Sequence, residues 1–281
     1  SLVASDYPLQ VLVVDNASTD ATLDLVKQFP QVECIPLEKN LGFGRANNVG
    51  LCRALQEQAD FAFLLNQDAR VMPDTIGQLV QCARDNQTFG ILSPLHLNGD
   101  GSSIDAGFVT YINRGTVEFV SDLYSGEVED VYRLQYANAA AWLLSRRCIE
   151  LVGGFDPLFF MYGEDDDFCQ RVLLHGLEIG FVPSAIMFHA RENRSDEKDL
   201  QSRVNREFAS MLVSLKSPEG RFIGRVADWG VEVLCETLWC VRNLALSNMV
   251  ALWRAAFGIL ARLGQIRKHR RKCQITGAHW L

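Results

Sequence analysis

A row of four acids near the middle of the chain is the first candidate for chemistry. Residues 164–167, EDDD, follow the aromatic segment FFMY and precede the apolar positions of a predicted helix, FCQRVLLHG. Acids at a helix start are favourable in any protein, because the N-terminal end of the helix dipole attracts negative charge. A carboxylate beside a water-excluding aromatic segment can also act as a general base. This segment alone leaves both interpretations open.

Polar residues at predicted strand ends are the second candidate. Asp15 follows the buried run LQVLVV, and Asn66 and Asp68 follow FAFLL. A carboxylate with a polar partner two residues earlier lies on the same side of the chain as that partner and can hold Mg²⁺ or Mn²⁺. The alternative is an ordinary strand-end turn, since Asp and Asn favour turns. His189 also follows a predicted strand and joins a metal site only if the fold brings it to Asp68.

Strands and helices alternate along the first half of the chain. Short connections between them predict an open, mostly parallel α/β sheet flanked by helices, with ligands beyond the carboxyl ends of the strands. The predicted strands are 9–14, 32–37, 61–66, 89–97 and 177–183, and the predicted helices are 21–29, 48–58, 73–85 and 168–176. A Gly/Asn loop, KNLGFGRANNVG, leads into the second of these helices.

The later segments give a weaker pattern. Residues 108–120 suggest a β-hairpin around Asn113-Arg114-Gly115, and residues 121–130 suggest a mobile polar loop. A helix is predicted at 199–215, followed by two amphipathic helices at about 221–245 and 247–267. We therefore expect a catalytic domain at 1–200 and a helical region at 201–281.

Charge and cysteine usage exclude several classes of protein. Residues 1–220 hold 17 Lys and Arg against 31 Asp and Glu, whereas residues 221–281 hold 10 against 3. An acidic body argues against nucleic-acid binding, and a basic tail could meet an anionic surface. The eight cysteines form no CxxC pair, which indicates reduced thiols in a cytosolic protein. No uncharged apolar run reaches the roughly 18 residues that a membrane-spanning helix needs.

The Gly-rich loop argues against two nucleotide-binding classes. NLGFGRANN has neither GxGxxG spacing nor a P-loop lysine, so dehydrogenase and P-loop functions lose support. Arg45 in this loop could still face a phosphate.

Five blocks in order resemble glycosyltransferase family 2, and within it the rhamnosyltransferase and galactofuranosyltransferase-like members. They are VDNASTD, NLGFGRANNVG, LLNQDA, GGFDPLFFMYGEDDDFCQR and a strand ending in FHA, and they cover about residues 5 to 200. The resemblance implies a glycosyltransferase A-type fold with a C-terminal helical appendage. It also implies an inverting, metal-dependent hexosyltransferase of bacterial cell-surface polysaccharide biosynthesis. Its donor would be a nucleoside diphosphate sugar, with rhamnose a candidate, and its acceptor a glycan or lipid-linked glycan.

The resemblance also implies roles for individual residues. Asp165 matches the catalytic base, with Glu164 and Asp167 as supporting neighbours. Asp68 matches the last position of the family's Asp-x-Asp metal motif, whose first position is Asn66 here, and His189 matches a histidine near the metal or diphosphate. The nucleotide site would comprise Asp15, Asn16, Ser18, Gly42, Arg45 and Asn66, and the acceptor would meet Tyr162, Trp142 and the segment 138–142.

Elementary chemistry agrees with this set of residues. Breaking a sugar–diphosphate bond requires that the leaving phosphates be neutralised, which a divalent metal does as a Lewis acid. A glycosidase needs two flanking carboxyls, one of them protonated, whereas a transferase needs one base and a metal site. We therefore expect Asp165 to be ionised, with a pKa that is not raised.

The chain departs from the family at its start. SLVASDYP looks like the end of the family's first helix, so we expect the first strand and most of that helix to be absent and a sheet edge to be open. A neighbouring chain in a homodimer could cover this edge.

Two rival functions remain, and two interpretations of the tail. The rivals are a nucleotidyltransferase on a similar sheet and an inactive glycan-binding or scaffold relative. The tail at 221–281 either packs on protein or anchors the chain peripherally at the inner face of the plasma membrane, through its tryptophans and basic end.

Overall fold

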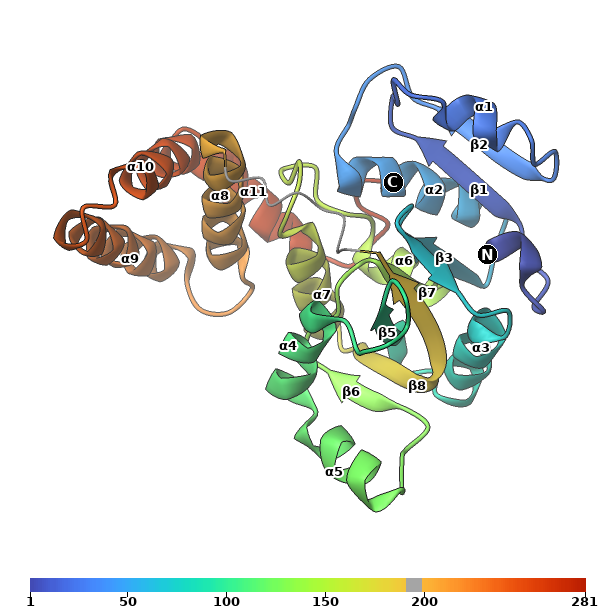
Figure 1. The fold of residues 1–281 in the computed structure, drawn as a ribbon. Helices are drawn as coiled ribbons and strands as arrows, with labels where there is room; N and C mark the ends of the chain where they lie inside the picture. Colours follow the sequence, from blue (N-terminus) through green and yellow to red (C-terminus); the bar gives the residue numbers. More distant parts are fainter. Residues whose placement is uncertain (191–198) are drawn as a thin grey trace.

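The strands form two sheets that share no hydrogen-bonded strand pair, and the smaller sheet, β1 with β2, lies at the upper right (Figure 1). The computed structural model describes residues 1–190 and 199–281, so most of the polar loop predicted after His189 lies outside the described residues. The strands are β1 (Val11–Asp15), β2 (Val32–Pro36), β3 (Phe61–Leu65), β4 (Ala69–Val71), β5 (Phe89–Asn98), β6 (Tyr132–Leu134), β7 (Ala141–Ser145) and β8 (Glu178–His189). The helices of the body are α1 (Thr22–Val26), α2 (Phe43–Gln56), α3 (Thr75–Asp85), α4 (Ala106–Gly115), α5 (Val117–Ser125), α6 (Arg146–Val152) and α7 (Glu164–Leu174).

The larger sheet is mixed. Its strand order is β3-β7-β5-β8-β4, with β6 paired to β8, and only β5 and β8 run parallel to each other. The smaller sheet is the parallel pair β1–β2. The prediction of helices flanking a sheet, with a helical appendage, is confirmed, but the prediction of one mostly parallel sheet is wrong. The short strands β4, β6 and β7 supply the antiparallel neighbours, and none of the three was predicted.

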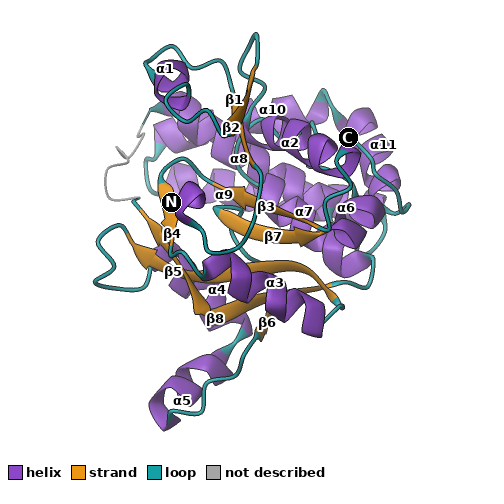
Figure 2. Cartoon of the chain, turned by 90° about the vertical axis from the view of Figure 1, so that its right-hand side faces the viewer, coloured by secondary structure: helices purple, strands orange, loops and turns teal. Residues whose placement is uncertain are grey.

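Helices lie on both faces of the larger sheet (Figure 2), and alternating residues of its central strands pack against these two layers. Leu92, Leu143 and Val182 pack against α3, whereas Ile91 and Trp142 pack in the core that α4 to α7 build on the other face. Side chains of successive strand residues point to opposite faces, so the apolar runs of β5, β7 and β8 serve both layers.

Helix α2 begins earlier than the sequence suggests. The Gly/Asn segment was predicted to be a loop up to residue 47, but its part from Phe43 onward is helical. Gly42 precedes this helix with φ +84°, and a Cβ at Gly42 would lie 2.2 Å from the carbonyl oxygen of Phe160. The amide of Phe43 donates to that same oxygen at 3.3 Å. Glycine at this position therefore lets the start of α2 touch the aromatic segment that precedes the acids.

The weakly patterned segment is helical. Helices α4 and α5 replace the predicted hairpin, and α5 also takes up the first half of the predicted mobile loop. Phe108, Tyr111 and Phe119 from these helices are buried against the sheet. Three or four residues separate the apolar positions of α4, which matches a helical period better than a strand period.

The C-terminal region contains α8 (Leu200–Lys216), α9 (Phe222–Arg242), α10 (Leu246–Leu260) and α11 (Leu263–Cys273). The helix predicted at 199–215 is confirmed as α8. The prediction of a single helix at 247–267 is wrong, because the chain bends by 69° between α10 and α11. Among the described helices, none has by itself the length and hydropathy to cross a membrane, and only the bent pair α10 and α11 meets both criteria together.

The end of the chain returns to the body. The amide of Gly154 donates to the carbonyl of His279, and the Asn48 side chain donates to the carbonyls of Phe155 and Trp280. The last residues therefore belong to the packing of the α2 and α6 side of the body, and not to the helical appendage alone.

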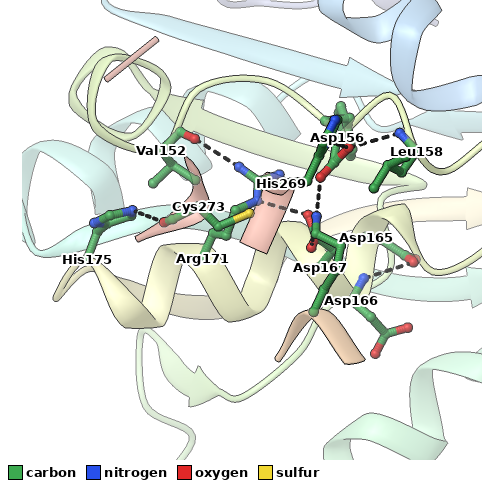
Figure 3. A network of polar contacts seen from close by, with 12 residues as sticks. Val152, Asp156, Leu158, Asp165, Asp166, Asp167, Arg171, His175, His269 and Cys273 are labelled. Atoms are coloured by element: carbon green, nitrogen blue, oxygen red, sulfur yellow. Dashed lines mark hydrogen bonds and ion pairs between the residues drawn. The ribbon is translucent and has the colours of Figure 1, made fainter. Parts of the chain in front are cut away.

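A buried ion cluster joins α7 to the C-terminal helices (Figure 3). Lys216 of α8 pairs with Asp156 and with Asp167, the latter at 2.6 Å, and Arg171 donates to Asp167 at 2.9 Å. His269 of α11 lies 2.7 Å from Asp156. Burial alone would lower the pKa of Lys216, but the charges of Asp167 and Asp156 outweigh it and raise that pKa.

This cluster predicts a large effect of a single charge. Lys216→Met keeps the apolar length of the side chain but removes the cation between two buried carboxylates. We expect the free energy of unfolding in urea to fall by about 3–5 kcal/mol, the usual cost of breaking a buried ion pair. Lys27→Met is the matched control, since Lys27 pairs with Asp24 on the exposed surface, and it should change stability little. Equal effects of the two substitutions would contradict the assigned role of the cluster.

Candidate active site

The first turn of α7 directs its acids to opposite sides. All four acids lie in this turn, where the helix dipole favours them. Asp165 and Asp167 are two residues apart, which is about 200° around a helix. Asp167 faces the ion cluster, whereas Asp165 faces the sheet. Two of these acids therefore have different surroundings: Asp167 belongs to the ion cluster, and Asp165 belongs to the candidate active site.

Asp165 is a buried hydrogen-bond acceptor. Tyr136 Oη donates to Asp165 Oδ2 at 2.7 Å, Asn138 Nδ2 donates to the same oxygen at 3.2 Å, and the amide of Asp166 donates to Oδ1 at 3.0 Å. Burial raises the pKa of Asp165, and the hydrogen bond from Tyr136 opposes that rise. The prediction of an unraised pKa is therefore wrong. A raised pKa suits a general base, because proton transfer is most efficient when the pKa lies near the working pH.

Glu164 lies beside Asp165 with one oxygen unsatisfied. Its side chain is buried, and among the described residues Oε2 has no hydrogen-bond partner. Burial, followed by the charge of Asp165, raises the pKa of Glu164 to about 7. An ideal Cβ at Gly44 would lie 3.7 Å from the Glu164 Cβ. The acid therefore stands next to the first turn of α2.

Two predicted site residues have structural positions instead. Asp167 was predicted to support the base, but both of its oxygens are engaged by Lys216 and Arg171. Trp142 was predicted to meet the acceptor, but it is fully buried and stacks on Phe155 with ring centroids 6.0 Å apart. The alternation of β7 turns Trp142 toward α7 and away from the surface.

Tyr162 keeps an accessible position. It is 40% exposed and has a positive φ of 69°, so the backbone presents its ring at the end of the aromatic segment, two residues before Glu164. A ring in that place can contact a molecule that approaches the first turn of α7.

Asp15 and its neighbours form a second polar group at the end of β1. Asp15 is buried, its Oδ2 accepts from the amide of Ser18 at 3.2 Å, and its Oδ1 has no hydrogen-bond partner among the described residues. Asn16 Oδ1 accepts from the amide of Leu41 at 2.8 Å. The loop after β1 is thereby tied to the loop before Gly42.

Arg45 lies at the start of α2 beside a groove. Its Nη2 donates to the carbonyl of Pro157 at 2.7 Å. The groove, of about 680 Å³, is lined by Arg45, Asn48, Arg53 and the C-terminal Trp280 and Leu281 among others. None of the acids of the candidate site lines it, so the groove is adjacent to that site and not its centre.

Asp68 and His189 meet at the edge of the larger sheet. Ala69 pairs with His189 across β4 and β8, and Asp68 Oδ1 lies 3.3 Å from His189 Nε2. A carboxylate and an imidazole that converge in this way fit a divalent metal ion. The backbone amide of Asn66 donates to the carbonyl of Ala140 at 2.9 Å, which connects the end of β3 to the residue before β7.

A second cluster has metal-ligand residue types but is filled by a lysine. Asp156, Asp167 and Cys273 have ligand atoms close enough to share an ion. Lys216 pairs with both of these carboxylates, and its ammonium already supplies the positive charge there. We therefore assign this cluster to stability.

Residues that the sequence analysis missed connect the metal pair to Asp165. The Tyr136 ring lies 5.6 Å from that of Tyr111, whose hydroxyl is 3.3 Å from His96 Nδ1, and the rings of His96 and His189 are 6.4 Å apart. On a shorter route, the amide of Ala140 donates to Asn138 Oδ1 at 3.1 Å. No local motif marks Tyr136 or Asn138, because their position depends on pairing between β3 and β7.

Comparisons with known proteins identify the relatives of this chain. Residues 1–104 match the profile described as glycosyl transferase family 2, and residues 131–193 match the profile described as the N-terminal domain of galactosyltransferase. An N-acetylglucosaminyl-diphospho-decaprenol L-rhamnosyltransferase of Mycobacterium tuberculosis is 30% identical over 236 residues, which are 76% of each chain. A dTDP-rhamnosyl transferase of Shigella flexneri is 25% identical over 66% of this chain and 61% of its own.

A solved structure shares the fold. The mannosyltransferase of Pyrobaculum calidifontis, in complex with GDP-Man and Mn²⁺, superimposes with a TM-score of 0.53 at 19% identity. The similarity covers 93% of this chain and 69% of the mannosyltransferase.

The raised pKa of Glu164 predicts a pH-dependent gain in stability. Because its folded pKa of about 7 lies above the unfolded value, ionisation destabilises the fold progressively between about pH 4.5 and pH 7. Glu164→Gln should therefore raise the free energy of unfolding by about 2–3 kcal/mol at pH 8 and change it little at pH 4.5. Urea titrations at both pH values measure this, with the exposed Glu150→Gln as control. An effect of Glu164→Gln that is the same at both pH values would contradict the assignment.

Proposed function

The chain belongs to glycosyltransferase family 2, and on that premise we propose that it transfers L-rhamnose from a nucleoside diphosphate donor to a lipid-linked glycan, with inversion. The names of two relatives support the choice of sugar, and the name of the mycobacterial relative supports the choice of acceptor. Family membership also favours this reaction over nucleotidyl transfer.

The observation that carries the proposal is the environment of Asp165. A buried carboxylate that accepts two side-chain hydrogen bonds on one oxygen and a backbone hydrogen bond on the other is held in one orientation. A base must be fixed within hydrogen-bond reach of the proton that it removes. Its position beside the end of β3, through Asn138 and Ala140, brings it next to the strand that precedes Asp68.

The donor would lie across the ends of β1 and β3. Asp15 has an accepting oxygen available for a base N–H, and Asn16 and Ser18 would fix the loop around it. The close contact at Gly42 and the guanidinium of Arg45 would border the diphosphate. A guanidinium suits phosphate oxygens because its N–H groups match their geometry.

Asp68 and His189 would hold the metal ion. The carboxylate and the imidazole converge to 3.3 Å. The carboxylate suits either Mg²⁺ or Mn²⁺, whereas the imidazole nitrogen favours Mn²⁺ over the harder Mg²⁺. The Mn²⁺ in the mannosyltransferase complex supports Mn²⁺ as the first ion to test. When bound, the ion neutralises negative charge on the leaving diphosphate.

The reaction needs one proton acceptor. Asp165 takes the proton of the acceptor hydroxyl, whose oxygen forms a bond to the anomeric carbon as the bond from that carbon to the diphosphate oxygen breaks. Tyr136 and Asn138 orient the carboxylate, and Glu164 and Tyr162 border the acceptor. A single displacement of this kind inverts the anomeric configuration.

Removal of the base predicts a loss of turnover without a loss of binding. Asp165→Asn should reduce rhamnosyl transfer by about a thousandfold, within the range that general bases contribute. Binding of dTDP-rhamnose with Mn²⁺, measured by calorimetry, should be unchanged. Asp166→Asn is the control, and it should retain activity within a few fold. Loss of donor binding in parallel with activity would contradict the role of Asp165 as the base.

The Tyr136 hydroxyl predicts a shift in the pH profile. It donates to the ionised form of Asp165, so Tyr136→Phe should raise the pKa of Asp165 further and move the acidic limb of kcat/KM up by about one pH unit. Tyr132→Phe also removes a buried tyrosine hydroxyl, one bonded to Asp122, and it should leave the limb in place. An acidic limb that stays fixed or moves down in Tyr136→Phe would exclude this role.

A further inference from the structure

Helix α9 has two apolar faces, and only one of them is buried. Trp229, Val233 and Cys240 pack inward. Val231, Leu234 and Leu238 are each about 60% exposed, although spacings of three and four residues align them in one stripe. A helix that needed only to cover α8 and α10 would carry polar side chains at these positions.

Helix α10 repeats the pattern. Leu252, Ala256 and Ile259 are buried, whereas Val250, Trp253 and Phe257 are exposed at the same spacing of three and four residues. The turn between the two helices contains Leu244, which is 83% exposed. The two exposed stripes and this turn, which we call the apolar hairpin, are unusual for a surface in contact with water.

Two of the three acids of α9 lie away from its stripe. Glu232 and Glu236 each lie two residues, or about 200° around the helix, from Leu234, whereas the exposed Asp228 lies three residues before Val231, at the N-terminal end of the stripe. Both Glu232 and Glu236 lie near Glu207 of α8. Burial raises the pKa of Glu207, and the charges of Glu236 and Glu232 raise it further. Between Val231 and Leu238 the stripe is thus separated from Glu232 and Glu236.

Helix α11, which follows α10 after a bend of 69°, supplies a basic surface. Arg267, Lys268, Arg271 and Lys272 line a depression of about 370 Å³ together with Gly264 and Ile275. The ion pairs among the described residues do not include any of these four side chains. Residues 221–281 carry 10 basic against 3 acidic residues.

We propose that residues 221–281 dock on an anionic lipid bilayer, with the apolar hairpin at the headgroup boundary and the α11 cluster on the lipid phosphates. Exposed Trp, Phe, Leu and Val with nearby Lys and Arg are the components of helices that lie in a membrane interface. Charge complementarity favours a bilayer over a tail-to-tail contact between two copies, because the tail of a second copy would be equally basic, whereas an anionic leaflet is complementary. The proposal does not depend on the sugar-transfer chemistry.

Vesicle flotation of the full chain, without nucleotide or acceptor, tests the proposal. The chain should float with vesicles of phosphatidylcholine and phosphatidylglycerol at low salt and not with phosphatidylcholine alone. Lys268→Ser/Arg271→Ser should lower the partition coefficient about thirtyfold, since each basic residue at an anionic surface contributes about 1 kcal/mol. Trp253→Ser/Phe257→Ser should lower it at least tenfold.

Matched substitutions and an oligomer measurement make the test decisive. Leu123→Ser/Tyr124→Ser removes exposed apolar side chains from α5 and should leave flotation unchanged. Because all the substituted side chains are at the surface, circular dichroism should show native folding in every variant. Failure of the wild-type chain to float, or equal flotation of all variants, would overturn the proposal. So would a dimer in light scattering that Trp253→Ser/Phe257→Ser dissociates, in a chain that does not bind vesicles.

Discussion

The ammonium of Lys216 between Asp156 and Asp167 is the interaction on which the rest of this structure depends. It connects the loop before α7, the first turn of α7 and the end of α8, while His269 extends the same cluster to α11. Buried charges tolerate little displacement, because each needs its partner at close range. The cluster therefore fixes the direction of α7, and the orientation of Asp165 follows from that direction. The buried ion cluster on one side of α7 thus determines the position of the proposed base, Asp165, on the other side.

The proposed site is not formed by one motif. It is formed by several elements, each of which contacts the next in space. The loop after β1 is tied to the loop before α2, α2 meets the aromatic segment at Gly42, and that segment leads into the acids. On the other side, β3 reaches Asp165 through Ala140 and Asn138, and β4 with β8 brings Asp68 to His189. Each contact is short, and together the contacts connect polar groups that come from distant parts of the chain.

Local patterns in the sequence predicted most of the strands and the longer helices, and the ordered blocks predicted the family. They did not predict that β7 pairs antiparallel with β3, because register between distant strands leaves no local signal. The resemblance placed Trp142 and the segment 138–142 near the acceptor, but it predicted neither the burial of Trp142 nor the hydrogen bonds from Tyr136 and Asn138 to Asp165. The raised pKa of Asp165 likewise depends on burial beneath distant elements. The helices α4 and α5 were missed because Gly115 and the polar residues around it favour a turn.

The central claim is that one carboxylate, Asp165, acts as the base of a single displacement. The anomeric configuration of the first-formed product, followed by proton NMR from a donor of known configuration, tests it most directly. The account predicts a product of inverted configuration from the earliest time points. A product that retains the configuration of the donor would require a second nucleophile and would contradict the assignment.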